Sequence, residues 1–145
     1  MGQSQFSQQE SWHRSKVAAI EGMHKSTLPS GLILCCMRGD SYEVNADTIR
    51  VAAKYMGKGV CAADLAGAEA LFPTVGYSDV FKLARELNVP FEIHAGEADG
   101  PSSIYSALEF GATRIGHGVR SIEEAVSSVR SWKIRWPFLT LWDLN

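Results

Sequence analysis

The chain has 145 residues, of which 46% are hydrophobic and 21% charged, a composition typical of one globular domain rather than a disordered segment. Its 14 basic and 16 acidic residues give a net charge of −2, and neither sign forms a long run, so we expect no nucleic-acid partner. No stretch approaches the ~18 apolar residues of a membrane span, and the amino terminus lacks the pattern of a secretion signal. We therefore expect a cytoplasmic protein without membrane association.

The cysteines Cys35, Cys36 and Cys61 are odd in number, lack CxxC spacing and lie inside apolar runs. Disulfide frameworks and zinc sites usually show paired, regularly spaced cysteines. We expect three reduced, buried cysteines that act as small hydrophobic residues.

The first half of the chain alternates helical and strand-like patterns. Apolar residues at helical spacing predict a helix over residues 8–25. The continuous apolar run LILCCM at Leu32–Met37 predicts a strand buried on both faces. Asn45 or Asp47 is expected to cap a second helix, and residues 60–65 (VCAADL) form the next predicted strand.

The second half repeats this alternation. A helix is predicted over residues 77–88, and a strand over residues 91–97 (FEIHAGE). Pro101 is expected to begin another helix, followed by a strand over residues 114–119 (RIGHGV) and a helix capped by Ser121.

Strands that alternate with helices through short connections predict parallel strands joined by right-handed crossovers. No GxGxxG follows a predicted strand, as a dinucleotide-binding fold would require, whereas polar residues gather at the carboxyl ends of several strands. The sequence therefore predicts an α/β fold over residues 1–128, a partial (β/α)₈ TIM barrel of about four consecutive βα units. A complete barrel needs ~200 residues or more, so four units are about half of one.

Residues 129–145 differ in character from the rest of the chain. They hold Trp132, Trp136 and Trp142, three of the four tryptophans, in an apolar run with no clear period. We expect this tail to lie outside the barrel units. A wrong reading frame or a retained intron is favoured over an ordinary hydrophobic strand.

The FEIHAGE stretch has the features of a chemical site. Side chains alternate along a strand, so His94 lies on the face opposite Ile93, at the carboxyl end. Glu97 follows three residues later and shares a pocket with His94 only if the chain turns, which Gly96 permits.

Three motifs end successive predicted strands: DLAGAE at residues 64–69, HAGE at residues 94–97 and GHG at residues 116–118. Together with LILCCMR at residues 32–38, they resemble the adenosine deaminases of the zinc-dependent (β/α)₈ metal-dependent hydrolase group. The resemblance covers residues 18–125, the central portion of such a protein.

The resemblance implies a role for each matching residue in converting adenosine and water to inosine and ammonia. His94 matches a zinc ligand, and Glu97 matches the acid that protonates the purine ring nitrogen. His117 matches the histidine that orients and helps deprotonate the zinc-bound water. Gly67 matches the glycine whose main-chain N–H contacts the purine, although close approach of strand and loop would also require glycine there. Zinc is the implied cofactor, since it lowers the pKa of bound water to roughly 7.

Parts of the family pattern are absent from the chain. The family's HxH pair is missing, since His13 and His24 are 11 residues apart, and Asp143 is the only late aspartate. Ala68 stands where the family often has an acidic residue. A catalytic zinc usually takes three protein ligands, so with His94 alone we expect little or no deaminase activity from the isolated chain.

Several alternatives remain open at this point. Asp64 is either a partner of a site residue or simply the polar end of a strand. The chain is either part of an adenosine deaminase, part of an adenine or AMP deaminase, or a non-catalytic fragment that self-associates through uncovered strand edges.

Overall fold

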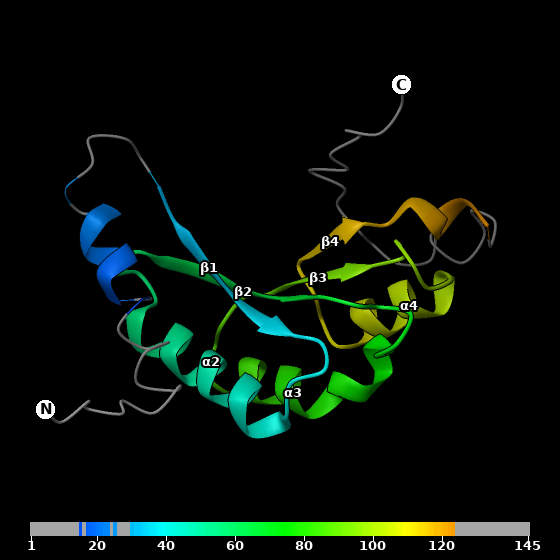
Figure 1. Ribbon diagram of the computed structural model, residues 1–145, viewed down its shortest axis with the longest axis horizontal. Helices are drawn as coiled ribbons and strands as arrows, with labels where there is room; N and C mark the ends of the chain where they lie inside the picture. The colour runs from blue at the N-terminus through cyan, green and yellow to red at the C-terminus, as the bar shows by residue number, and fades with distance from the viewer. Residues whose placement is uncertain (1–14, 16, 24, 26–29, 124–145) are drawn as a thin grey trace, which may run out of the picture.

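The computed structural model describes residues 15, 17–23, 25 and 30–123 (Figure 1). Strands and helices alternate, after a helical stretch at residues 17–23. The elements are β1 (Leu32–Met37), α2 (Tyr42–Tyr55), β2 (Val60–Ala66), η1 (Thr74–Tyr77), α3 (Ser78–Glu86), β3 (Glu92–Ala95), α4 (Pro101–Glu109), β4 (Arg114–His117) and η2 (Val119–Ile122), where η marks a 3₁₀ helix. The predicted tail at residues 129–145 lies outside the described residues.

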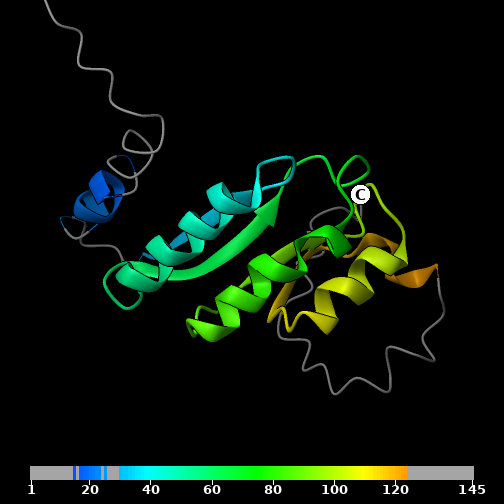
Figure 2. The ribbon, with the colours of Figure 1, turned by 90° about the horizontal axis from the view of Figure 1, so that it is seen from below.

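The strands are parallel, which confirms the predicted α/β fold with parallel strands. β1 pairs with β2, and β3 pairs with β4. The two pairs meet at an isolated bridge between Ala63 and Phe91, where the Ala63 N–H donates to the Pro90 carbonyl oxygen at 2.9 Å. Helices α2, α3 and α4 all lie on one side of the strands, as the views in Figures 1 and 2 show.

The core lies between these helices and the strands. Cys36, Ile49, Phe81 and Ile93 have no exposed surface. The rings of Phe81 and Phe91 pack with their centroids 4.5 Å apart. Burial of such large apolar side chains supplies most of the stabilisation in a fold of this kind.

The opposite side of the strands, which we call the open face, carries Ile33, Cys35, Met37, Asp64 and His94. Leu34 and Cys36 are buried under the helices, but the alternate residues Ile33 and Met37 are each 37% exposed. The prediction that β1 is buried on both faces is therefore wrong. The continuous apolar run was insufficient to predict it, because no residue within 30–123 packs over the Ile33 and Met37 positions closely enough to bury them.

The three cysteines differ in burial. Cys36 is buried, Cys35 is half-buried and Cys61 is exposed, so the prediction of three buried cysteines is wrong for Cys61. Within the described part of the chain, all three are reduced thiols that form no disulfide.

Helix α2 begins earlier than predicted. Ser41 is the N-cap, and its hydroxyl oxygen accepts from the Val44 N–H at 3.4 Å. Asn45 turns inward instead: it accepts from the Met37 N–H at 2.9 Å and donates to the Met37 carbonyl oxygen at 3.0 Å. The predicted cap at Asn45 or Asp47 is wrong because Asn45 satisfies the main chain at the outer edge of β1.

The later helices agree better with the sequence. α3 lies within the predicted 77–88, and Pro101 begins α4 as expected. Ser121 lies inside η2, and the rest of the helix predicted after it falls outside the described residues. Across the residues that the structure describes, every helix falls short of the length and apolarity that a membrane crossing requires.

Candidate active site

The carboxyl ends of β2, β3 and β4 bring four titratable side chains close together on the open face. Asp64 Oδ1 lies 2.9 Å from His94 Nδ1, and the Asp64 side chain is only 8% exposed. This hydrogen bond raises the pKa of His94, against the opposing effect of partial burial. It also commits Nδ1 to Asp64 and leaves Nε2 as the ring nitrogen suited to a metal or substrate.

Gly116 provides the surface on which the His94 ring rests. The two residues are opposite one another in the β3–β4 pair. A Cβ atom at position 116 would lie 2.9 Å from both Cγ and Cδ2 of His94, closer than such atoms approach in proteins. The first glycine of the GHG motif is therefore required by the histidine on the neighbouring strand.

His117 ends β4 in a left-handed conformation with φ of 60°. Its ring centroid lies 5.3 Å from that of His94, and its Nε2 lies 3.3 Å from Glu97 Oε2. Strand pairing sets His117 opposite Ala95, so alternation along the strand alone would not bring it to His94. His117 joins His94 and Glu97 at the residue where the main chain departs from strand geometry.

The turn predicted at Gly96 is present, with φ of 74°. A Cβ atom there would also lie 2.5 Å from Ile104 Cδ1, so both the conformation and the space favour glycine. The turn directs the chain after β3 so that Glu97 reaches His117. The structure thus brings together three of the residues singled out from the sequence: His94, Glu97 and His117.

Gly67 has a structural reason of its own. Its φ is 115°, and a Cβ atom would lie 3.2 Å from Arg38 Cβ and 3.3 Å from the Arg38 main-chain nitrogen. Close approach of two chain segments is the alternative that the sequence left open for this glycine. A contact between its N–H and a purine stays a prediction.

Two carboxylates complete the site, and the sequence assigned neither. Asp64 was left open and now pairs with His94; its place on the same face of the neighbouring strand was the available signal. Glu69 lies in a loop, where no periodicity indicates burial, yet it is only 3% exposed. Burial alone would raise its pKa, but hydrogen bonds from Ser103 and from main-chain N–H groups, led by that of Ala98, outweigh burial and lower it to about 2.

The metal-binding capacity of this part of the chain is limited. Within the described ranges, no group of three or more His, Cys, Asp or Glu side chains is arranged to hold a metal ion. Cys35 Sγ lies 3.6 Å from Asp64 Oδ2, but burial, and then the charge of Asp64, raise the pKa of this thiol to about 11. It stays protonated at neutral pH and is a poor metal ligand. The chemistry of His94 Nε2 suits one ligand of a metal such as zinc, and the other described residues do not supply two more.

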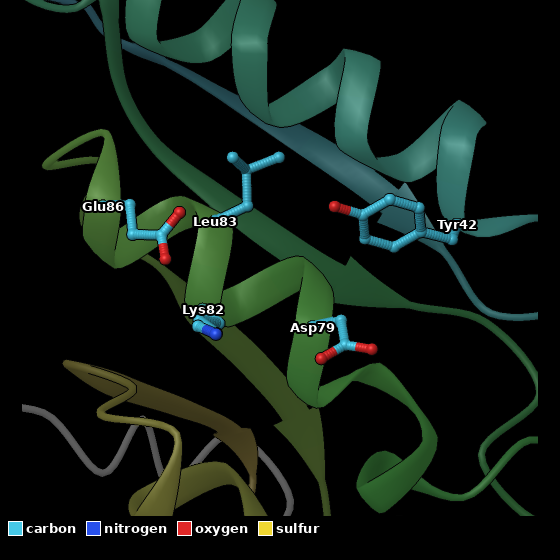
Figure 3. A pocket seen from close by; sticks show the side chains of 5 residues that line it. All are labelled: Tyr42, Asp79, Lys82, Leu83 and Glu86. Carbon is cyan, nitrogen blue, oxygen red and sulfur yellow. The ribbon is translucent and has the colours of Figure 1, made fainter.

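A separate hollow of about 240 Å³ lies between α2 and α3, on the helix side of the strands (Figure 3). Tyr42 comes from α2, and the remaining lining residues come from α3: Asp79, Lys82, Leu83 and Glu86. None of these side chains belongs to the cluster around His94.

Comparison of the sequence with a family model and with curated relatives gives one family. The sequence model of the family described as "Adenosine deaminase" matches residues 3–130. The adenosine deaminase of Haemophilus ducreyi is 50% identical over 115 residues, covering 73% of this chain and 33% of the relative. That of Clostridium kluyveri is 41% identical over 96 residues, covering 66% and 28%. The chain thus spans about a third of the length of these curated relatives.

Solved structures agree at the level of the fold. The Arabidopsis N6-mAMP deaminase superposes with a TM-score of 0.63 at 22% identity, covering 71% of this chain and 34% of that protein. The Arabidopsis ADAL protein complexed with IMP gives the same values. Since the family model matches most of the sequence, the chain belongs to the adenosine deaminase family.

Proposed function

We propose that this chain is the central part of an adenosine deaminase, which converts adenosine and water to inosine and ammonia. The observation that carries the proposal is the contact between Glu97 Oε2 and His117 Nε2, at 3.3 Å, beside the ring of His94. An acid, a base and a metal-binding imidazole at the ends of adjacent parallel strands suit hydrolytic deamination. The fold we propose around them is four βα units of a (β/α)₈ barrel over residues 1–128.

Each residue has a proposed role in moving protons. Water attacks the ring carbon that bears the amino group, and His117 takes a proton from this water. Glu97 donates a proton to the adjacent ring nitrogen, which accepts the electron pair displaced into the ring. The carbon–nitrogen bond to the amino group then breaks as that group takes the proton held by His117 and leaves as ammonia. The added hydroxyl gives its proton to the Glu97 carboxylate, which leaves the carbonyl of inosine and restores the acid. Gly67 is proposed to donate its main-chain N–H to the purine.

Zinc is proposed as the cofactor, with Nε2 of His94 as one ligand. Asp64 supports this assignment because it holds Nδ1 and so orients the ring. Further ligands would come from outside the described residues, and the bound zinc would supply a water of lowered pKa. The cytoplasm is the proposed location, in keeping with three free cysteines.

Two alternatives rest on specific observations. Of the alternatives within the same reaction class, an adenine or an AMP deaminase, the AMP deaminase is favoured by the fold match to proteins described as an N6-mAMP deaminase and as ADAL with IMP. Self-association without catalysis is favoured by open strand edges, because among the described strands β1 pairs only with β2 and β4 only with β3.

The decisive experiment incubates the purified chain with zinc and adenosine and follows adenosine absorbance and ammonia release. We expect at most weak activity, which Glu97→Gln abolishes and the exposed control Glu86→Gln preserves. Folded protein that releases no ammonia would contradict catalysis by this chain. Competition among adenosine, adenine and AMP then identifies the substrate, and light scattering distinguishes a monomer from a self-associated form.

A further inference from the structure

Glu69 is the centre of an unusually complete set of hydrogen bonds. Its carboxylate accepts five of them, all from residues that follow β3. Oε1 accepts from the Gly96 N–H at 2.7 Å and from the Ser103 hydroxyl at 2.5 Å. Oε2 accepts from three consecutive N–H groups, those of Glu97 at 3.0 Å, Ala98 at 2.8 Å and Asp99 at 3.1 Å. Both carboxylate oxygens are thus committed to residues 96–99 and the start of α4.

A chain of side chains continues from Ser103 to the end of β1. Ser103 uses its one hydroxyl hydrogen on Glu69, so Thr74, with its oxygen 2.6 Å away, donates to Ser103. Thr74 in turn accepts from Arg38 Nη2 at 2.8 Å. The same Nη2 donates to the His94 carbonyl oxygen at 2.7 Å. Arg38, Thr74, Ser103 and Glu69, which we call the clamp, therefore hold residues 94–99 from both ends.

The clamp is buried, whereas the side chain that it serves is exposed. Arg38 is 6%, Thr74 0%, Ser103 2% and Glu69 3% exposed. The side chain of Glu97 is 58% exposed, so little packing fixes its position. The position of the Glu97 side chain must therefore be fixed by its main chain. The Glu97 N–H donates directly to Glu69. A charged acceptor holding a series of N–H groups gives stronger and more directional bonds than neutral groups would.

We propose that Glu69 is a positioning residue that fixes the main chain of residues 96–99 and thereby holds Glu97 against His117. The inference rests on the proposed function for the catalytic meaning of the Glu97–His117 contact, but the contact itself is measurable without catalysis. Both carboxylate oxygens of Glu69 are directed at the N–H groups of residues 96–99 and the Ser103 hydroxyl. Glu69 acts through Glu97.

A glutamine at position 69 tests the role of the carboxylate. An amide has one acceptor oxygen and an NH₂ group that only donates. With this NH₂ at the Oε2 position, it faces the N–H groups of residues 97–99; in the opposite orientation, it faces the Gly96 N–H. Either arrangement breaks the set while side-chain size is kept.

The experiment uses the isotope-labelled full chain, without zinc or substrate, and compares Glu69→Gln with Ser103→Ala and the exposed control Glu86→Gln. It records amide hydrogen exchange and nuclear Overhauser contacts between the Glu97 methylenes and the His117 ring. We expect Glu69→Gln to accelerate exchange of the 96–99 amides at least tenfold relative to the β1 and β2 amides, and to remove the Glu97–His117 contact. Ser103→Ala leaves four main-chain bonds to Glu69, so the contact is expected to persist, as in Glu86→Gln.

If Glu69→Gln fails to fold, Glu69→Asp decides the question. Aspartate keeps the charge, but its side chain is one methylene shorter, so the carboxylate lies farther from the N–H groups of residues 96–99. Loss of the Glu97–His117 contact with β1 and β2 protection intact would support the proposal. A retained contact, with exchange of the 96–99 amides within twofold of the wild-type rate, would overturn it and leave Glu69 as a purely structural residue. Failure to deaminate adenosine while the contact is intact would refute only the proposed function.

Discussion

The two faces of the strands differ in what fills them. On the helix side, Cys36 and Ile93 are completely buried, whereas on the open face Ile33 is 37% exposed and His94 lies beside Asp64. Apolar burial is therefore concentrated on one side, and the groups capable of proton transfer on the other. Parallel strands make this division possible, because successive side chains point to opposite faces while all the carboxyl ends meet at one edge.

Two isoleucines, one on each face, give the largest expected difference. Ile93→Ala removes a wholly buried side chain and leaves a cavity, so we expect the free energy of unfolding to fall by about 2–5 kcal/mol. Ile33→Ala removes the same atoms from a partly exposed position and should lower it by about 1 kcal/mol or less. Urea unfolding measures both. Equal losses would mean that the open face is packed as tightly as the helix side.

Glu69 is an exception to this separation of apolar and polar groups, because it is a charged group buried as deeply as the core residues. Its pKa in the folded chain, about 2, lies below the ordinary value of 4.5, so the ionised form stabilises the fold. This contribution is fully present above pH 4.5 and is lost as the pH falls toward 2. We expect Glu69→Gln to lower the free energy of unfolding by about 2–3 kcal/mol at neutral pH.

The pH dependence separates this carboxylate from other causes of acid unfolding. Protonated Glu69 resembles glutamine, so the difference in unfolding free energy between wild type and Glu69→Gln should shrink between pH 4.5 and 2. Urea titrations of both proteins at a series of pH values measure this difference. A difference that is the same at pH 6 and pH 3 would show that the charge of Glu69 does not contribute.

Gly116 tests the open face itself. Gly116→Ala places a methyl group 2.9 Å from two ring carbons of His94, and we expect a loss of about 1–2 kcal/mol together with a displaced ring. Gly76→Ala is the matched control, because a Cβ atom there meets nothing within 4 Å. Urea unfolding gives the energies, and the imidazole nitrogen resonances report whether His94 keeps its bond to Asp64. An unmoved resonance in Gly116→Ala would contradict the packing of His94 on this glycine.

The sequence predicted the parts of this division that local patterns encode. Strand alternation placed His94 opposite Ile93, and Gly96 indicated the turn that brings Glu97 into the cluster. It could not predict that Asn45 binds the edge of β1, or that Glu69 is buried, because both depend on main-chain groups that come close only in the folded chain. The prediction that β1 is buried on both faces was wrong because an apolar run shows only that a strand can be buried. It does not show whether another part of the chain packs on each face.

The adjacent residues Cys35 and Cys36 allow the two faces to be compared in the unmutated protein, so no contact is lost before the measurement. Cys36 faces the helices and has no exposed surface, so it should react with iodoacetamide only after unfolding. Cys35 faces the other way, but its pKa of about 11, compared with an ordinary 9.0, lowers its thiolate fraction at pH 8 about 100-fold. Cys61 is exposed and should react first. Mass spectrometry of timed samples gives the order of labelling. Rapid labelling of Cys35 would contradict its partial burial beside the negative charge of Asp64, which together raise the pKa of that thiol and keep it protonated.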